Sequence, residues 1–351
     1  MRRPVLASFL LVVPLLPLGA QQMPPIGIID FYGLRALPES TVRAALGFRE
    51  GDPVPDSAGP ATRRLRALPG VADARLNLVC CSSDDKAILF VGVAESGAVV
   101  NAHHSAPRGR IRLPDDVVQL GRAFDDTLMA AIRQGQAGEH DSAGHAFFDY
   151  PAANAIQHRY LAIAARQLPI LRDVLRHSAS AEHRALAAVL LGYAPSVGDV
   201  VLDLENAIHD PHDGVRNNAM RALAVIALYA QQSPRLGIRV SATPFVAMLN
   251  SLVWTDRNKA SLALLRLTTR RDPALLALLR ARALPALVDI ARWRSTGHAY
   301  AGYMILGRVE GMQDDALEEA WKRGDRSAVL ESAARIIGPL PASAATHDSP
   351  G

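Results

Sequence analysis

One pattern of residues recurs in this 351-residue chain at a spacing of 41 positions, and it restricts the possible folds more than any other feature. The segment from Arg216 reads RNNAMRAL, and the segment from Arg257 reads RNKASLAL. A further step of the same length reaches HAYAGYMIL, which begins at His298. The alignment brings three small residues to one equivalent position, namely Ala219, Ala260 and Ala301. Self-similarity at a period of about 40 residues is typical of stacked helical repeats.

An apolar segment precedes each of these segments, so the repeating unit is predicted to be a pair of helices. Related pairs at shorter spacing end in EHRALAAVLLGYA, from Glu182, and in DRSAVLESAARIIG, from Asp325. One pair cannot bury its apolar face alone, and neighbouring pairs therefore stack around a continuous core. Aromatic residues form only 5% of the chain, which favours closely packed helices over a large β-sandwich. We expect about five helix pairs over residues 157–338, arranged as an all-α solenoid.

The unit that begins at Leu202, LDLENAIHDPHDGVRNNAMRALAVIA, resembles the HEAT repeat of armadillo-like proteins. In that family an Asp ends the turn between the helices, a Val-Arg pair begins the second helix, and an Ala and a Leu pack it against the first. The matching residues are Asp210, Val215, Arg216, Ala219 and Leu223. Part of the pattern recurs at Asp256, Arg257, Ala260 and Leu264. The resemblance implies that Asp210 and Arg216 form a structural ladder between neighbouring repeats, and that the second helices line a concave face.

Residues 26–97 have a different character, because strand-like segments alternate with short helical ones. IGIIDFYG predicts a strand, PESTVRAALG and PATRRLRALPG predict helices, and VADARLNLV and KAILFVGVAE predict two further strands. This β-α-α-β-β order resembles a POTRA domain, the periplasmic module of outer-membrane barrel assembly and secretion proteins. The markers of the resemblance are Gly33, Gly51, Val71 and residues 93–95. The family adds strands of other chains to its sheet, which implies protein binding. The predicted fold class is an α+β module followed by the solenoid.

The first twenty residues, MRRPVLASFLLVVPLLPLGA, have the basic start, short apolar run and small final residues of a cleavable signal peptide. We expect cleavage after Ala20, a periplasmic mature protein and no integral membrane segment in it.

The cysteines Cys80 and Cys81 are sequence neighbours, for which a disulfide is strained, so no disulfide framework is expected. The formal net charge is +4, without a basic run or an aromatic-interleaved patch, and we therefore expect no nucleic-acid partner.

Residues 98–156 are interpreted as a connecting segment with one helix over 114–134, since apolar residues recur there at helical spacing. The histidine and aspartate residues between 140 and 158, and the HDPHDG segment at 209–214, invite a metal assignment. Their spacings do not match those of established zinc sites, so loop polar groups and a capped interhelical turn are preferred. The three tryptophans are expected near the ends of first helices, as caps over the repeat edges: Trp254, Trp293 and Trp321. Residues 339–351 are predicted to be a disordered tail.

Three classes of function follow from these features. The first is an envelope protein that binds other proteins, as a scaffold, through the POTRA-like module and the concave face of the solenoid. The second is an accessory factor of outer-membrane protein assembly or secretion, and the third is a HEAT-like lyase or enzyme partner. The chain contains no GxSxG, HExxH or phosphate-loop motif, so no catalytic, cofactor-binding or metal residue is assigned and no enzyme is predicted. Polar residues of the second helices that packing does not need are the predicted protein-binding residues: Asn217, Asn218, Arg221, Asn258 and Lys259.

Overall fold

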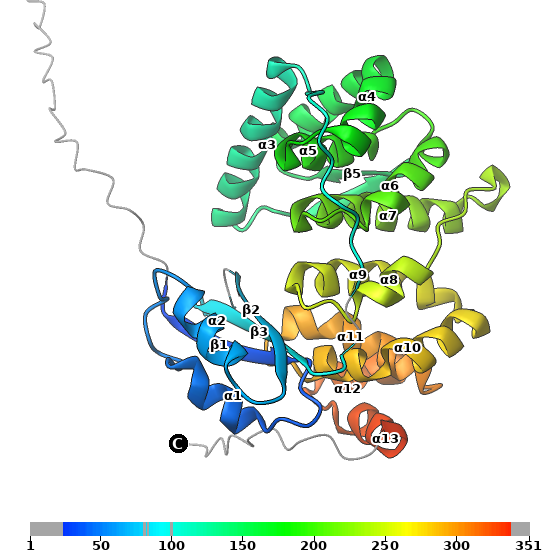
Figure 1. The fold of residues 1–351 in the computed structure, drawn as a ribbon. Coiled ribbons are helices and arrows are strands. Elements are labelled where there is room, and N and C mark those ends of the chain that lie inside the picture. The colour runs from blue at the N-terminus through cyan, green and yellow to red at the C-terminus, as the bar shows by residue number, and fades with distance from the viewer. Residues whose placement is uncertain (1–23, 80–81, 83, 99–100, 338–351) are drawn as a thin grey trace, which may run out of the picture.

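Figure 1 presents the computed structural model, which describes residues 24–79, 82, 84–98 and 101–337. The protein is of the α+β class, with a small N-terminal sheet and a larger helical region. The predicted signal peptide, the two cysteines and the predicted disordered tail lie outside the described residues.

The N-terminal module has the predicted order of elements, strand, two helices and two strands. They are β1 (Ile26–Tyr32), α1 (Glu39–Leu46), α2 (Gly59–Arg66), β2 (Val71–Val79) and β3 (Ala87–Glu95). The sheet has the order β1-β3-β2, in which β3 lies parallel to β1 and antiparallel to β2. Gly33 ends β1 at φ 85°, and a Cβ atom there would lie 2.1 Å from the Val93 carbonyl oxygen, so the position requires glycine.

Both faces of β3 are buried. Leu89 and Val91 pack with the helices of the module, against Val42 of α1 and Leu65 of α2. On the opposite face of the sheet, Phe90 belongs with Ile88 and Tyr32 to the core of the helical region. The near-continuous apolar run AILFVGV is the sequence counterpart of a strand that is covered on two sides. The sheet therefore lies between its own helices and the helical region.

Five helix pairs follow one another in the described part of the helical region. They are α4 (Pro151–His177) with α5 (Ala181–Leu191), α6 (Val201–Ala207) with α7 (Asp213–Gln232), α8 (Thr243–Met248) with α9 (Trp254–Leu267), α10 (Pro273–Arg292) with α11 (Thr296–Val309), and α12 (Asp314–Lys322) with α13 (Ser327–Ile337). Short 3-10 turns lie at Val197–Val200, Pro234–Leu236 and Thr268–Arg270. The second helices contact one another in sequence, α5 with α7, α7 with α9 and α9 with α11. The two helices of each of the first four pairs are in contact, whereas α13 contacts α10 and α11.

The aligned alanines occupy equivalent buried positions, with Ala219 and Ala260 fully buried and Ala301 exposed by only 3%. Neighbouring helix axes approach to about 8–10 Å, and a larger side chain at such a position forces them apart. Replacing any of the three by Leu should lower the free energy of unfolding by about 1–3 kcal/mol, measured by urea denaturation. Asn217→Ala, on a half-buried position of α7, should cost about 0.5 kcal/mol or less. Equal losses for the two kinds of substitution would contradict the alignment.

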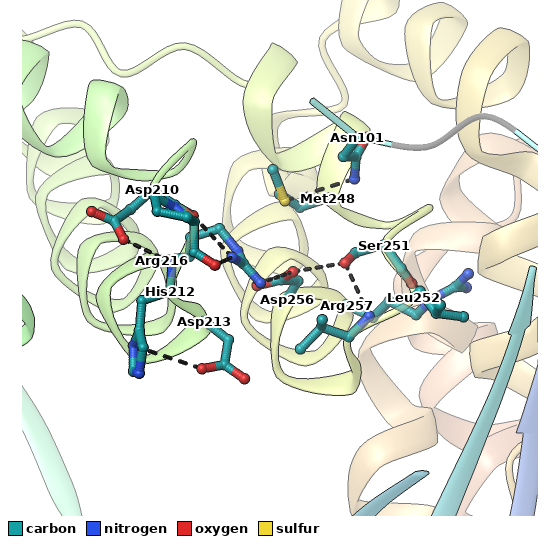
Figure 2. A network of polar contacts seen from close by, with 12 residues as sticks. Asn101, Asp210, His212, Asp213, Arg216, Met248, Ser251, Leu252, Asp256 and Arg257 are labelled. Carbon is teal, nitrogen blue, oxygen red and sulfur yellow. Dashed lines mark hydrogen bonds and ion pairs between the residues drawn. The ribbon is translucent and has the colours of Figure 1, made fainter. Parts of the chain in front are cut away.

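Buried arginine–aspartate pairs join successive helix pairs. Arg184 of α5 binds Asp210 through two hydrogen bonds of 2.7 and 2.9 Å. Figure 2 shows the next pair, in which Arg216 of α7 binds Asp256 of α9 at 3.0 and 2.9 Å. Arg216 also donates to the backbone carbonyl of Asp210, at 2.9 Å. Asp210 and Arg216 therefore belong to a ladder of contacts between neighbouring units, although each side chain pairs with a different partner.

The ladder continues to the N-terminal module. Arg257 of α9 lies 3.5 Å from Asp289 of α10. The same carboxylate accepts hydrogen bonds from the backbone N–H of Gly33, at 3.0 Å, and from the guanidinium of Arg35, at 2.9 Å. The last acidic residue of this series is thus shared between a helix and the end of β1.

Two tryptophans of the helical region contact the sheet. The ring centroid of Phe90 lies 4.8 Å from that of Trp254 and 4.8 Å from that of Trp293. These tryptophans were expected to cap repeat edges. They instead cover the face of β3 that lies opposite the helices of the module. Trp254 is moreover the first residue of a second helix, α9. Trp321 of α12 packs on Tyr300 and Tyr303 of α11.

Asp30 of β1 is buried at this interface and accepts backbone hydrogen bonds from Arg294, at 2.8 Å, and Ser295, at 3.1 Å. Burial raises the pKa of this carboxyl to about 6, against the lowering effect of the two backbone N–H groups. A raised carboxyl pKa stabilises the folded protein below the unfolded pKa, about 3.9, and this contribution is lost as the pH rises through about 6.

Wild-type protein should therefore lose roughly 2 kcal/mol of unfolding free energy relative to Asp30→Asn when the pH is raised from 4 to 7. Urea denaturation of both proteins across this range measures the difference. The unfolding free energy of the variant is subtracted from that of the wild type at each pH. This subtraction cancels the contributions of all other carboxyl groups, because both proteins contain them. A difference that does not change with pH would show that Asp30 titrates normally.

Residues 101–113, named here the strap, run back along the helical region and are visible in Figure 1 as the cyan segment beside α8 and α6. The side chain of Asn101 donates to the Ala247 carbonyl at the end of α8, at 3.0 Å. The backbone N–H groups of three further strap residues then bond to later parts of the chain. They are His104 to His209 at 2.7 Å, Gly109 to His177 at 2.8 Å and Leu113 to the His183 ring at 2.9 Å.

After the strap, α3 (Asp115–Arg133) corresponds to the helix expected over 114–134. A β-hairpin of β4 (Glu139–Ser142) and β5 (His145–Phe148) follows it, where only a loop was expected. Its two-residue turn has positive φ at Ala143 and Gly144, a conformation for which alanine gives little sequence signal. Helix α4 then begins at Pro151, six residues before the expected boundary. Residues 98–156 are thus more structured than a connection.

Candidate ligand-binding site

A cavity of about 410 Å³ is lined on one side by α3 and the β4–β5 hairpin. The second helices of the first three pairs, α5, α7 and α9, line it on the other side. Its volume is in the usual range of small-ligand sites, about 300–1,000 Å³. The contributing elements are α3, the hairpin, α4, α5, α7 and α9, most of which are visible in the upper half of Figure 1. Apolar lining residues include Leu128, Phe148, Leu186, Val189 and Val225.

Four of the five predicted binding residues line this cavity. Asn217, Asn218 and Arg221 lie on consecutive turns of α7, and Lys259 faces the cavity from α9. Asn258 is not among the lining residues, because it lies one position before Lys259 and so points about 100° away around the helix. Four of the five residues thus share one cavity wall, and the assignment of all five to protein binding stays a prediction.

Arg221 joins the polar wall to the hairpin. Its guanidinium lies 2.7 Å from the Glu139 carboxylate of β4 and 5.1 Å from the ring centroid of Phe148 in β5. The charge of Arg221 is thus compensated by a carboxylate. Asn217 and Asn218 are also connected, because Asn217 donates to the Asn218 side chain at 3.0 Å and Asn218 donates to the Ala185 carbonyl at 3.0 Å. These contacts fix the amides along the junction of α5 and α7.

Lys259 differs from its neighbours. No hydrogen bond or ion pair joins its ammonium group to any residue in the described part of the chain. Burial, and secondarily the positive charge of Arg221, lowers the pKa of Lys259 to about 8. The group is therefore still mostly charged at neutral pH. Lys259 is partly exposed, and an accessible ammonium group with no hydrogen-bonded partner is a natural binding point for an anion.

Buried polar groups form the floor of the cavity. The Gln157 amide donates to the Tyr193 hydroxyl at 2.7 Å and to the Ala146 carbonyl at 3.0 Å. Burial raises the pKa of Tyr193 to about 12, so its hydroxyl stays neutral. The hydroxyl of Tyr160, a residue with no exposed surface, has no hydrogen-bond partner among the described residues. Burial also raises the Tyr160 pKa well above its usual range, so this hydroxyl stays neutral.

Residues of the 140–158 segment are placed apart rather than around one point. His140 bonds to Asp149 at 2.7 Å, whereas His145 bonds to the Gly192 carbonyl at 2.9 Å and His158 stacks on Phe147 at 5.0 Å. In the turn at 209–214, the His212 side chain accepts from the Gly214 N–H at 3.2 Å and so caps α7. No cluster of three or more histidine, cysteine, aspartate or glutamate residues suited to a metal occurs in the described ranges.

Sequence reasoning missed the cover of the cavity and its floor. Phe148, Gln157 and Tyr160 were read as part of a connection or of a helix start. The available signal was the apolar run HAFF, which follows a two-residue turn and fills the space above α4. A strand of four buried residues is too short for its pattern to distinguish strand from loop.

Comparisons of the sequence with protein-family models and with curated proteins produced no match. Among the helices that the structure describes, none combines the length and apolar character needed to cross a membrane. The site must therefore be interpreted from its own geometry, which is that of a largely apolar cavity with one unpaired cation and several neutral polar groups.

Proposed function

We propose that this chain is a periplasmic protein that binds other proteins reversibly, with a POTRA-like module and a HEAT-like solenoid as its two binding parts. The strand order of the module and the arginine–aspartate ladder between helix pairs support these two family assignments. The pattern of residues 1–20 supports export. Such a protein needs no reactive side chain, because solenoids and sheet edges bind through surface shape and backbone groups.

The observation that carries the proposal is the cavity, which gathers Asn217, Asn218, Arg221 and Lys259 on the wall formed by the second helices. Its polar groups are held in place by neighbours, as in a preformed site. It contains binding groups of both kinds, an apolar lining and a few polar atoms in fixed positions. No arrangement of a nucleophile with a base accompanies them in the described residues lining the cavity, so binding accounts for the site without a chemical step.

A second surface is the outer edge of β2, which pairs with β3 on one side only in the described sheet. Leu78 on this strand is exposed by 39%, so a residue at this position is accessible to a partner. An open strand edge can pair with an extended segment of another chain. This edge favours the second candidate function, an accessory role in outer-membrane protein assembly or secretion, in which β2 adds a strand of a client protein.

Site-specific photocrosslinking in envelope extract tests the proposal. A photoreactive residue is placed at Asn217 in the cavity or at Leu78 on the β2 edge, and at exposed Arg323 beyond α12 as the control. We expect protein adducts from the first two positions, with different partners, and none from the control. Adducts with barrel or secretion components at Leu78 would support the second candidate. Identical adducts, or none, at the three positions would contradict protein binding.

A further inference from the structure

Two charged groups mark different parts of the cavity, an exposed ion pair between α3 and α5, and Lys259 on α9. Arg122 of α3 and Glu182 of α5 form an ion pair of 2.8 Å whose side chains are 66% and 57% exposed. Lys259 lies on α9, and α7 separates that helix from α5. Neighbouring axes are about 8–10 Å apart, so two such steps separate this ion pair from Lys259. The cavity is therefore elongated across the helices.

The charges along this path leave one cation uncompensated, on α9. Arg122 is paired with Glu182, and Arg221 is paired with Glu139. Asp125 also lines the cavity, but it is exposed and lies on α3. Lys259 is thus the cation of the described lining that has no carboxylate partner. A ligand that fills the cavity would contact its apolar walls and, at α9, the single unpaired positive charge of Lys259.

Resting on the proposed function, we propose that the cavity binds the carboxyl-terminal end of a partner protein, with the terminal carboxylate on Lys259 and an apolar last side chain against the lining of α5 and α7. An extended chain end matches an elongated cavity, since each residue advances about 3.3 Å. The carboxylate provides the hydrogen-bonded counter-charge that the ammonium group lacks. Asn217 supplies a further polar contact along the path.

The test uses the full mature chain and a library of fluorescein-labelled heptapeptides in which the last two residues vary. Each peptide is made with a free carboxyl terminus and with a terminal amide, and binding is measured by fluorescence anisotropy. We expect peptides with an apolar last residue to bind about 10- to 100-fold more tightly as the acid than as the amide, the range expected for a charge-assisted hydrogen bond. Equal binding of acid and amide would overturn the proposal.

Variants of Lys259 test whether its ammonium group binds the terminal carboxylate of the peptide. Lys259→Met should abolish the difference between acid and amide and leave amide binding unchanged, whereas Lys259→Arg should retain most of the difference. Lys322→Met, the same change at an exposed position in α12, should have no effect. Thermal unfolding checks the fold of Lys259→Met, which should be no less stable than wild type, because Lys259 makes no hydrogen bond or ion pair that the substitution would break. An acid preference that survives in Lys259→Met would overturn the assignment.

A free acid offers the same chemistry as a chain end, and sodium octanoate distinguishes the two. Tight octanoate binding without binding of any peptide would overturn the chain-end assignment. Protein crosslinks at Asn217 together with equal acid and amide binding would also overturn it while leaving the proposed function intact. Absence of both crosslinks and peptide binding would instead remove the proposed function itself.

Discussion

Arg216→Met should lower the free energy of unfolding by about 3–5 kcal/mol, because it leaves the carboxylate of Asp256 buried without its counter-charge. The two side chains are exposed by only 2% and 0%, so water cannot replace the lost partner. The Ser251 hydroxyl donates to Asp256 at 2.7 Å. Because it is a neutral group, it compensates only a part of the buried negative charge of Asp256. Urea denaturation followed by circular dichroism measures the change.

A matched control is Arg122→Met, which removes an exposed arginine–glutamate pair and should cost about 1 kcal/mol or less. The double variant Arg216→Met with Asp256→Leu should recover much of the loss, since two apolar residues replace the pair. If Arg216→Met and Arg122→Met were equally destabilising, the ladder would contribute no more than a surface ion pair.

Phe90→Ala should lower the free energy of unfolding by a comparable amount, about 3–5 kcal/mol, because it removes the contact of the Phe90 ring with the tryptophans of the helical region. The ring of Phe90 is fully buried and packs on Trp254 and Trp293. The loss should be accompanied by a red shift of tryptophan fluorescence as water reaches these two indoles.

The control for Phe90 is Phe31→Ala in the neighbouring strand. The Phe31 ring is half-buried and lies 4.7 Å from the Arg43 guanidinium within the module, away from the two indoles. This variant should be less destabilising and should leave the tryptophan emission unchanged. An equal spectral shift in both variants would mean that the indoles report on the folding of the module and not on its docking.

Local patterns in the sequence predicted most of the elements, although not the β4–β5 hairpin. The 41-residue spacing identified Ala219, Ala260 and Ala301 as one buried position, because a repeated pair of helices needs the same small residue at each crossing. The strands and helices of residues 26–97 followed from alternation and from glycine and proline positions. These are features that neighbouring residues determine among themselves.

Contacts between distant segments were not predictable in the same way. Phe90 could be recognised as apolar, but nothing near it in the sequence indicates that Trp254 and Trp293 cover it. The uninterrupted apolar run of β3 did indicate burial on both faces, and that signal was not used. In the site, Lys259 was identified through its alignment with α7, whereas Tyr160 and Phe148 depend on how α3 and the hairpin fold back over the helices.

The contacts of Asp30 also determine the order of assembly. Its hydrogen bonds to Arg294 and Ser295 join residues 264 and 265 positions apart in the chain. The module has a core of its own and can form early, but it can dock only after α10 and the start of α11 exist. Contacts of such high sequence separation slow folding. The face of the sheet that carries Phe90 therefore stays uncovered until α10 and the start of α11 have been synthesised, and an exposed apolar face promotes aggregation during that interval.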